Sequence, residues 1–68
     1  MTIEELGQKI KGRRSTLSIS QRQLADYTGL SVVTLSQIES GKANPSFETL
    51  NEIFHFLSLE FLVIPYIR

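Results

Sequence analysis

The stretch "QRQLADYTGLSVVTLSQIES", residues 21–40, decides the fold. Ala25 lies in a first short helical stretch, Gly29 follows where a helix would end in the left-handed conformation, and Leu35 and Ile38 form the apolar side of a second helix. A small residue at position 25 allows the second helix to cross closely over the first. This spacing favours a helix-turn-helix, although any pair of antiparallel helices can carry Ala and Gly at such places.

Hydroxyl side chains predict the starts of four helices, at Thr2, Ser20, Ser31 and Ser46. The last three helices are expected to cover about 20–28, 31–40 and 46–58, and Gly29 and Gly41 are expected to end two of them. Helical spacing predicts an apolar inner face made of Leu6, Ile10, Leu24, Ala25, Leu30, Leu35, Ile38, Leu50, Ile53, Phe54 and Leu57.

Length and composition indicate a single small domain. The chain has 68 residues, 41% of them hydrophobic, and it contains no cysteine and one histidine. Domains of this size are marginally stable and commonly depend on disulfides, metals or oligomerisation. Disulfides are excluded, and one histidine is too few for the usual metal site. We therefore expect no metal and no cofactor, and we expect oligomerisation.

Charge is divided unevenly along a chain whose net charge is zero. Residues 1–45 hold six basic and four acidic side chains, a net charge of +2, and residues 46–68 hold one basic and three acidic ones, a net charge of −2. The first part could therefore face phosphates. No apolar run reaches the 18 or so residues that a membrane span needs, and the first ten residues do not resemble a signal peptide, so we expect a cytoplasmic protein that does not enter a membrane.

Side chains suited to catalysis are scarce. His55 stands between two phenylalanines without a nucleophile arranged around it, and Glu4 and Glu5 are adjacent, so they diverge on a helix. We therefore expect that the protein is not an enzyme.

The C-terminal segment "LEFLVIPYIR", residues 59–68 and hereafter the tail, is apolar on both alternating faces. A strand here has no partner strand within the chain, so we predict a β-strand that pairs with its copy across the two-fold axis of a dimer. The alternative is a tail folded back over its own core. The predicted division is a domain at 1–58 and a dimerisation strand at 59–68, with dimer contacts through Phe61, Leu62, Val63, Ile64 and Tyr66.

From about residue 4 to 58, the chain resembles the lambda-repressor-like, Xre/Cro-type helix-turn-helix family. The residues that match the family's pattern are Arg14, Gln21, Ala25, Gly29, Ser31, Thr34, Ile38, Glu39, Gly41 and Leu50. The resemblance implies a mostly α, four-helix fold that binds double-stranded DNA and represses transcription. It also implies an ion pair between Arg14 and Glu39, where the residues alone allow two separate solvated charges.

Base contacts are expected from the side chains of the third predicted helix that point away from Leu35 and Ile38, and the resemblance implies phosphate contacts near the helix ends. Base edges are expected to contact Val32, Val33, Ser36 and Gln37; phosphates are expected to contact Gln21, Arg22, Ser31, Thr34, Ser40, Lys42 and Asn44. Valines can contact thymine methyl groups, although either valine can instead belong to the core. Gln37 stands where family members often carry a basic residue, which shifts the expected affinity towards dimerisation and Lys42.

The last helix and tail resemble HipB-type antitoxins. That resemblance implies a homodimer that represses its own operon and binds a HipA-like serine/threonine kinase toxin. If the dimer is two-fold, its DNA operator is expected to be an inverted repeat. The alternative is a stand-alone Xre-family regulator without a toxin partner. Acidic side chains at Glu48, Glu52 and Glu60 distinguish the two, because DNA would repel them and a protein could contact them, unless they form an ordinary solvated face.

Overall fold

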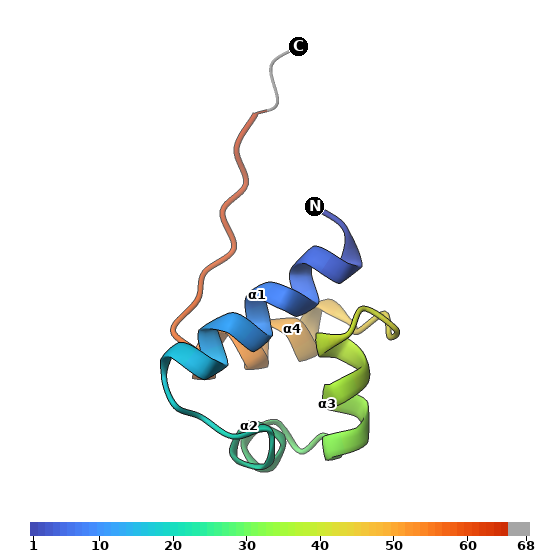
Figure 1. The fold of residues 1–68 in the computed structure, drawn as a ribbon. Helices are drawn as coiled ribbons and strands as arrows, with labels where there is room; N and C mark the ends of the chain where they lie inside the picture. The colour runs from blue at the N-terminus through green and yellow to red at the C-terminus, as the bar shows by residue number, and fades with distance from the viewer. Residues whose placement is uncertain (66–68) are drawn as a thin grey trace.

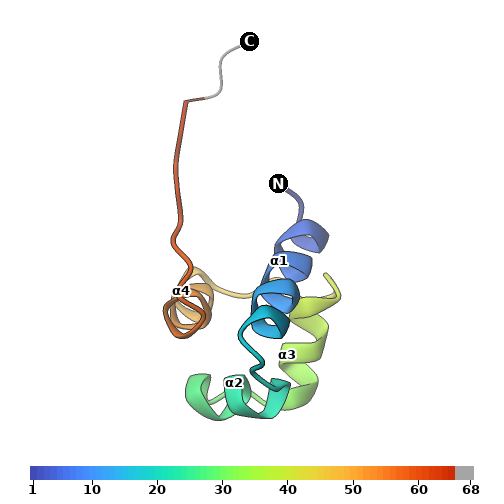
Figure 2. The same cartoon turned by 60° about the vertical axis from the view of Figure 1, so that its left-hand side comes forward.

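The computed structural model describes residues 1–65 and contains four helices in that range. They are α1 (Ile3–Thr16), α2 (Gln21–Thr28), α3 (Val32–Glu39) and α4 (Phe47–Phe56). Figure 1 shows α1 running above the other helices, and Figure 2 shows α3 and α4 on opposite sides of the molecule with α2 below. Because α2 contacts both α3 and α4, it joins the two sides. The predicted mostly α, four-helix fold is confirmed.

All four predicted helix starts are confirmed. The side chains of Thr2, Ser20, Ser31 and Ser46 each accept a hydrogen bond from the backbone N–H three residues later. Thr2 also forms a complete capping box with Glu5, whose carboxylate accepts the backbone N–H of Thr2 at 3.0 Å. This bond lowers the pKa of Glu5. The expected ranges were longer by one or two residues at some ends because they included the capping residues, which flank the helix.

Left-handed residues follow all four helices, and only two of them are glycine. Gly29 and Gly41 have φ of 75° and 77°, as predicted, but Ser18 and Ser58 have φ of 57° and 55°. Sequence reasoning missed the two serines because glycine is the usual signal for this conformation.

The end of α4 is held by α1. Arg13 donates from Nε to the carbonyl oxygen of Leu57 at 2.8 Å, and the N–H of Leu59 donates to the carbonyl oxygen of Phe54 at 2.8 Å. Both bonds satisfy carbonyl groups that the helix end leaves free. They also set the direction in which the tail leaves the helices.

The core matches the predicted inner face. Its buried hydrophobic side chains are Ile10, Leu24, Ala25, Leu35, Ile38, Ile53, Phe54 and Leu57. Leu6, Leu30 and Leu50 are partly buried against them. The small side chain of Ala25 is 2% exposed, in agreement with the close helix crossing expected from residues 21–40.

A buried ion pair joins α1 to α3. The Arg14 guanidinium donates from Nε and Nη2 to the two carboxylate oxygens of Glu39, at 2.7 and 3.0 Å, and from Nη1 to the carbonyl oxygen of Ile19 at 2.9 Å. The side chains are 13% and 3% exposed. The carboxylate raises the pKa of Arg14, so the guanidinium stays charged at any working pH. The ion pair expected from the family resemblance is therefore confirmed.

Gly7 allows α1 to approach the end of α3. A Cβ atom at this position would lie 2.5 Å from the carbonyl oxygens of both Ile38 and Glu39. Those atoms belong to the backbone and cannot move aside without moving the helix. Sequence reasoning did not single out Gly7, because a glycine inside a helix carries no signal of what crosses it.

The described part of the tail, residues 59–65, leaves the helices and contains no strand (Figures 1 and 2). Its first aromatic side chain contacts α4: the rings of Phe61 and Phe54 stack with centroids 4.2 Å apart, and Phe47 lies 5.3 Å from Phe61. The start of the tail thus packs on its own domain, as in the alternative considered above. Strand pairing across a dimer stays a prediction, and Tyr66 lies outside the described residues.

Within residues 1–65, no helix combines the length and apolar character needed to cross a bilayer.

We expect Gly7→Ala and Gly12→Ala to have opposite effects on stability. Alanine at position 7 should destabilise the fold by about 1–3 kcal/mol or more, because α1 must move away from α3. Alanine at position 12, where nothing lies within 4 Å of the added carbon, should stabilise the fold by about 0.5–1 kcal/mol through helix propensity. Urea unfolding measures both. Equal effects would contradict the close crossing.

We expect Arg14→Met to destabilise the fold by about 3–5 kcal/mol, because Glu39 is left as an unpaired buried charge. Adding Glu39→Met should recover most of the loss, since it removes the charge and supplies apolar volume. The free energy of unfolding of the two variants checks this. A single variant within about 0.5 kcal/mol of the natural protein would show that the pair is not coupled to stability.

Candidate nucleic-acid interface

The outer face of α3 presents three of the predicted base-contacting residues. Val33 is 68% exposed, and Ser36 and Gln37 are also exposed. They occupy one side of the helix because they are three and four residues apart, and the opposite side is held in the core by Leu35 and Ile38. Because the inner side of α3 is fixed in the core, its outer side is free to enter the major groove of DNA.

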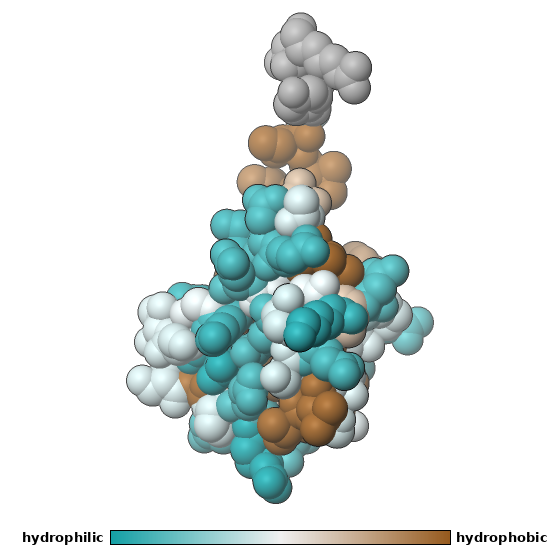
Figure 3. All heavy atoms as spheres, turned by 45° about the vertical axis from the view of Figure 1, so that its right-hand side comes forward, coloured by the Kyte–Doolittle hydropathy of each residue, from teal (hydrophilic) through white to brown (hydrophobic). Residues whose placement is uncertain are grey.

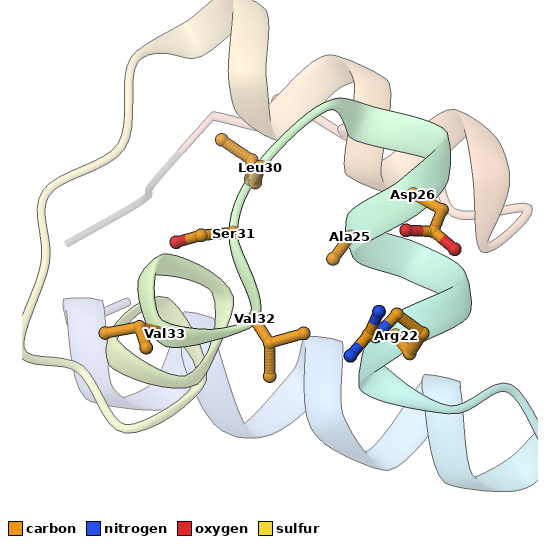
Figure 4. Close-up of a pocket in the computed structure, with 7 residues that line it drawn as sticks. All are labelled: Arg22, Ala25, Asp26, Leu30, Ser31, Val32 and Val33. Carbon is orange, nitrogen blue, oxygen red and sulfur yellow. The ribbon is translucent and has the colours of Figure 1, made fainter.

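Val32 and Val33 have different surroundings. An open hollow of about 330 Å³ lies between α2 and α3; its lining residues are Arg22, Ala25, Asp26, Leu30, Ser31, Val32 and Val33. Figure 4 shows Val32 on the side of α3 that faces α2, and Val33 pointing away from α2. Val32 is partly buried against the core. The sequence allowed each valine either to belong to the core or to contact DNA bases. The structure favours a core position for Val32 and an outward position, available to DNA, for Val33.

A second hollow, of about 100 Å³, lies where α1, α2 and α3 meet. Its lining residues are Lys11, Gln21, Ser36, Glu39 and Ser40. Three of these were predicted DNA contacts, and the structure brings them together. Lys11 was missed. The signal available in the sequence is its position three residues before Arg14, which places both side chains on one face of α1.

The amide of Gln21 is oriented by the buried ion pair. Its Nε2 donates to Oε1 of Glu39 at 3.1 Å, and the Gln21 side chain is only partly exposed. An amide has two N–H donors and a carbonyl acceptor, so one N–H remains for a phosphate oxygen. The ion pair that joins α1 to α3 thus also holds Gln21 at the start of α2.

The hydroxyl groups predicted to contact phosphates make local bonds. Ser31 donates from Oγ to the Thr34 hydroxyl at 2.9 Å and accepts the Thr34 backbone N–H at 3.0 Å. Ser40 donates to the carbonyl oxygen of Gln37 at 3.2 Å. The Thr34 hydroxyl accepts from Ser31, and its own proton is therefore available to a phosphate.

The remaining predicted phosphate contacts are exposed side chains around α3. Arg22 lies in the first turn of α2, and Lys42 and Asn44 lie in the connection between α3 and α4. Arg22 and Lys11 line the two hollows beside α3, and Lys42 and Asn44 follow the end of α3. Asp26, exposed on α2, is the acidic side chain in the α2–α3 hollow.

Groupings suited to hold a metal ion are absent from residues 1–65, which contain no cluster of three His, Asp or Glu side chains. His55 is exposed near the end of α4.

Comparison with solved structures agrees with this arrangement. The restriction-modification controller protein C.AhdI from Aeromonas hydrophila superposes with a TM-score of 0.80 and 26% sequence identity, over 85% of this chain and 88% of that one. The clp gene regulator ClgR from Corynebacterium glutamicum superposes with a TM-score of 0.83 and 29% identity in two structures, over 87% of this chain and over 76% and 63% of theirs.

Sequence comparison leads to the same group of proteins. An uncharacterized HTH-type transcriptional regulator of Mycobacterium tuberculosis is 39% identical over 62 residues, which are 91% of this chain and 44% of the relative. The ImmF control region 10 kDa protein of Bacillus phage phi105 is 34% identical over 61 residues, which are 90% of this chain and 68% of the relative. This chain thus spans less than half the length of the mycobacterial protein.

The family model HTH_3, described as helix-turn-helix, matches residues 10–64. This range contains the crossing of α2 and α3, the exposed face of α3 and the hollows beside it. The chain therefore belongs to the helix-turn-helix family.

Proposed function

We propose that this protein is a dimeric, sequence-specific DNA-binding regulator of transcription. The observation that carries the proposal is the outer face of α3, where Val33, Ser36 and Gln37 are exposed in a chain of the helix-turn-helix family. Relatives named as transcriptional regulators, and a restriction-modification controller with the same fold, support it.

In the proposed complex, α3 lies in the major groove of DNA. Val33 contacts a thymine methyl group, and the Gln37 amide bonds to a base edge, for which adenine is the best match. Arg22 and Lys42 contact the phosphates on either side and add no sequence information. The exposed Lys11 joins them at the hollow beside Ser36. Binding of this kind takes place in the cytoplasm, on chromosomal or phage DNA.

A dimer would place two copies of α3 on one face of DNA. If the copies are related by a two-fold axis, the operator is an inverted repeat whose half-sites are about 34 Å apart or a multiple of that distance. Each α3 has one exposed amide and no basic side chain on its outer face, so a single copy has few groups with which to hold DNA. Pairing two copies supplies affinity that one copy lacks.

The antitoxin role is a second candidate. It rests on the exposed acidic side chains Glu48, Glu52 and Glu60, the first of which follows Phe47, itself 67% exposed. A protein partner could use this surface, whereas DNA would repel it. The relatives described above carry names of regulators and a controller, which favours regulation without a toxin. Purification from the native host with a HipA-like kinase in equal amount would support the antitoxin role.

We expect Gln37→Ala and Lys42→Ala to affect DNA binding differently. After an operator has been selected from a random DNA library, Gln37→Ala should reduce the preference for operator over random DNA by about 5- to 100-fold, because it removes a base contact. Lys42→Ala should weaken both DNAs similarly and reduce the salt slope by about one. Fluorescence anisotropy at several salt concentrations measures both effects.

Asn51→Ala is the matched control, since Asn51 is an exposed amide on α4, on the opposite side of the molecule from α3 (Figure 2). It should leave both binding constants unchanged. If Gln37→Ala and Lys42→Ala lost equal affinity for operator and random DNA, the assignment of α3 to the major groove would be wrong.

A further inference from the structure

An apolar groove of about 320 Å³ lies between α1, α4 and the start of the tail, and it shares no lining residue with the two hollows beside α3. Its lining residues are Met1, Leu6, Lys9, Phe54, Leu59, Glu60, Phe61 and Leu62. Six of these eight side chains are hydrophobic, and the two charged ones have opposite signs. The groove has no part in the proposed DNA contact.

The tail beside this groove exposes a continuous hydrophobic segment. Leu62, Val63 and Ile64 are 82%, 94% and 69% exposed, and Figure 3 shows hydrophobic side chains projecting from the hydrophilic surface. Three consecutive large apolar side chains in water are unfavourable, and exposed patches of this kind mark interaction sites. Covering this segment with another apolar surface would therefore be favourable.

Leu62 lines the edge of the groove of its own chain, whereas Val63 and Ile64 do not line it. Phe61 is fixed at the groove by stacking on Phe54, with ring centroids 4.2 Å apart. From that point an extended chain advances about 3.3 Å per residue, so Leu62–Ile64 reach about 10 Å outward. The views in Figures 1 and 2 agree that the tail runs away from the helices.

We infer that the groove receives residues 62–64 of a second copy, and that two copies exchange these segments reciprocally across a two-fold axis. A two-fold interface requires one surface to be complementary to itself. This chain meets that requirement, because the groove and the segment that would fill it lie next to each other on the same molecule. The inference rests on the dimer of the proposed function and names its contacts.

Charge at the groove agrees with a second copy as occupant. Lys9 and Glu60 line the same groove, and a two-fold rotation can bring Lys9 of each copy towards Glu60 of the other. A lipid surface would leave Glu60 facing anionic or apolar groups, and an unrelated protein would have no reason to match both charges. A self-complementary pair of charges suits a chain of net charge zero.

Sedimentation equilibrium tests the apolar part of the interface. The natural protein should be a dimer, and Leu62→Asp should weaken dimerisation about a hundredfold or more, because two buried leucines are replaced by two charges. Val33→Asp is the matched control: it adds a charge at an exposed valine outside the groove and should leave the dimer intact. A natural protein that stays monomeric up to about 100 µM would overturn the inference.

Exchanging the two charges tests whether Lys9 of one copy contacts Glu60 of the other. Lys9→Glu and Glu60→Lys should each weaken the dimer about fivefold, because the two-fold axis repeats each repulsion. The double variant should restore the dimer to near its original strength. Since both residues are exposed, neither change should unfold the domain. Absence of any change in all three variants would contradict the groove as the dimer contact.

Cross-linking separates this interface from pairing of the two tails alone. The chain has no cysteine, so Lys9→Cys and Leu62→Cys each introduce a unique thiol. When the two variants are mixed and oxidised, a disulfide should join Lys9→Cys of one copy to Leu62→Cys of the other. Asp26→Cys, on the exposed side of α2, should not link to Lys9→Cys. A dimer that links Leu62→Cys only to itself would overturn the inference in favour of tail pairing.

The outcome is independent of DNA binding. Anisotropy with a half-site DNA reports the contact of a single copy. If the half-site is bound while the protein stays monomeric, the groove inference and the dimer of the proposed function fail, and the proposed DNA contact through α3 stands. If the dimer forms through the groove but neither half-site nor operator is bound, the DNA proposal fails and the groove inference stands.

Discussion

The ion pair between Arg14 and Glu39 is the interaction on which the other parts of the structure depend. It is buried, and both oxygens of the carboxylate are used by one planar guanidinium. The same guanidinium bonds to the carbonyl oxygen of Ile19, and the same carboxylate accepts from Gln21. One pair of charges therefore connects α1, the turn after it, the start of α2 and the end of α3. A charge buried this deeply needs its partner in place, so these elements cannot move independently.

This constraint reaches the proposed DNA contact. Glu39 ends α3, and Gly7 lets α1 lie against the carbonyl groups of Ile38 and Glu39. With its end held by α1 and its inner side held by the core, α3 has one side left for solvent, which carries Val33 and Gln37. The precision of a base-reading helix comes from such supporting contacts, because small displacements remove hydrogen bonds to base edges.

The surface formed by α1, α4 and the start of the tail differs from the α3 face, because it is mainly apolar. An apolar groove lies there between these elements. With eight buried hydrophobic side chains among residues 1–65, the domain has little stability to spare, and burial of further apolar surface in a dimer would add to it. In the proposed complex the two surfaces have separate roles: the α3 side would contact DNA through polar and small apolar groups, and the groove would contact a second copy through large apolar groups.

The sequence by itself determined the four helix starts, two of the four helix ends, the core and the crossing of α2 and α3. These depend on neighbouring residues, such as a hydroxyl at a cap or apolar side chains three and four apart, and such patterns are visible in one dimension. Only the tertiary structure decided which valine is exposed, what Gly7 touches, how Arg13 caps α4 and where Phe61 packs. Val32 and Val33 are adjacent in the chain, yet one faces α2 and the other faces solvent, because the rotation of α3 is set by contacts with helices distant in sequence. The Arg14 and Glu39 charges, 25 positions apart, could be paired beforehand only by resemblance to a family.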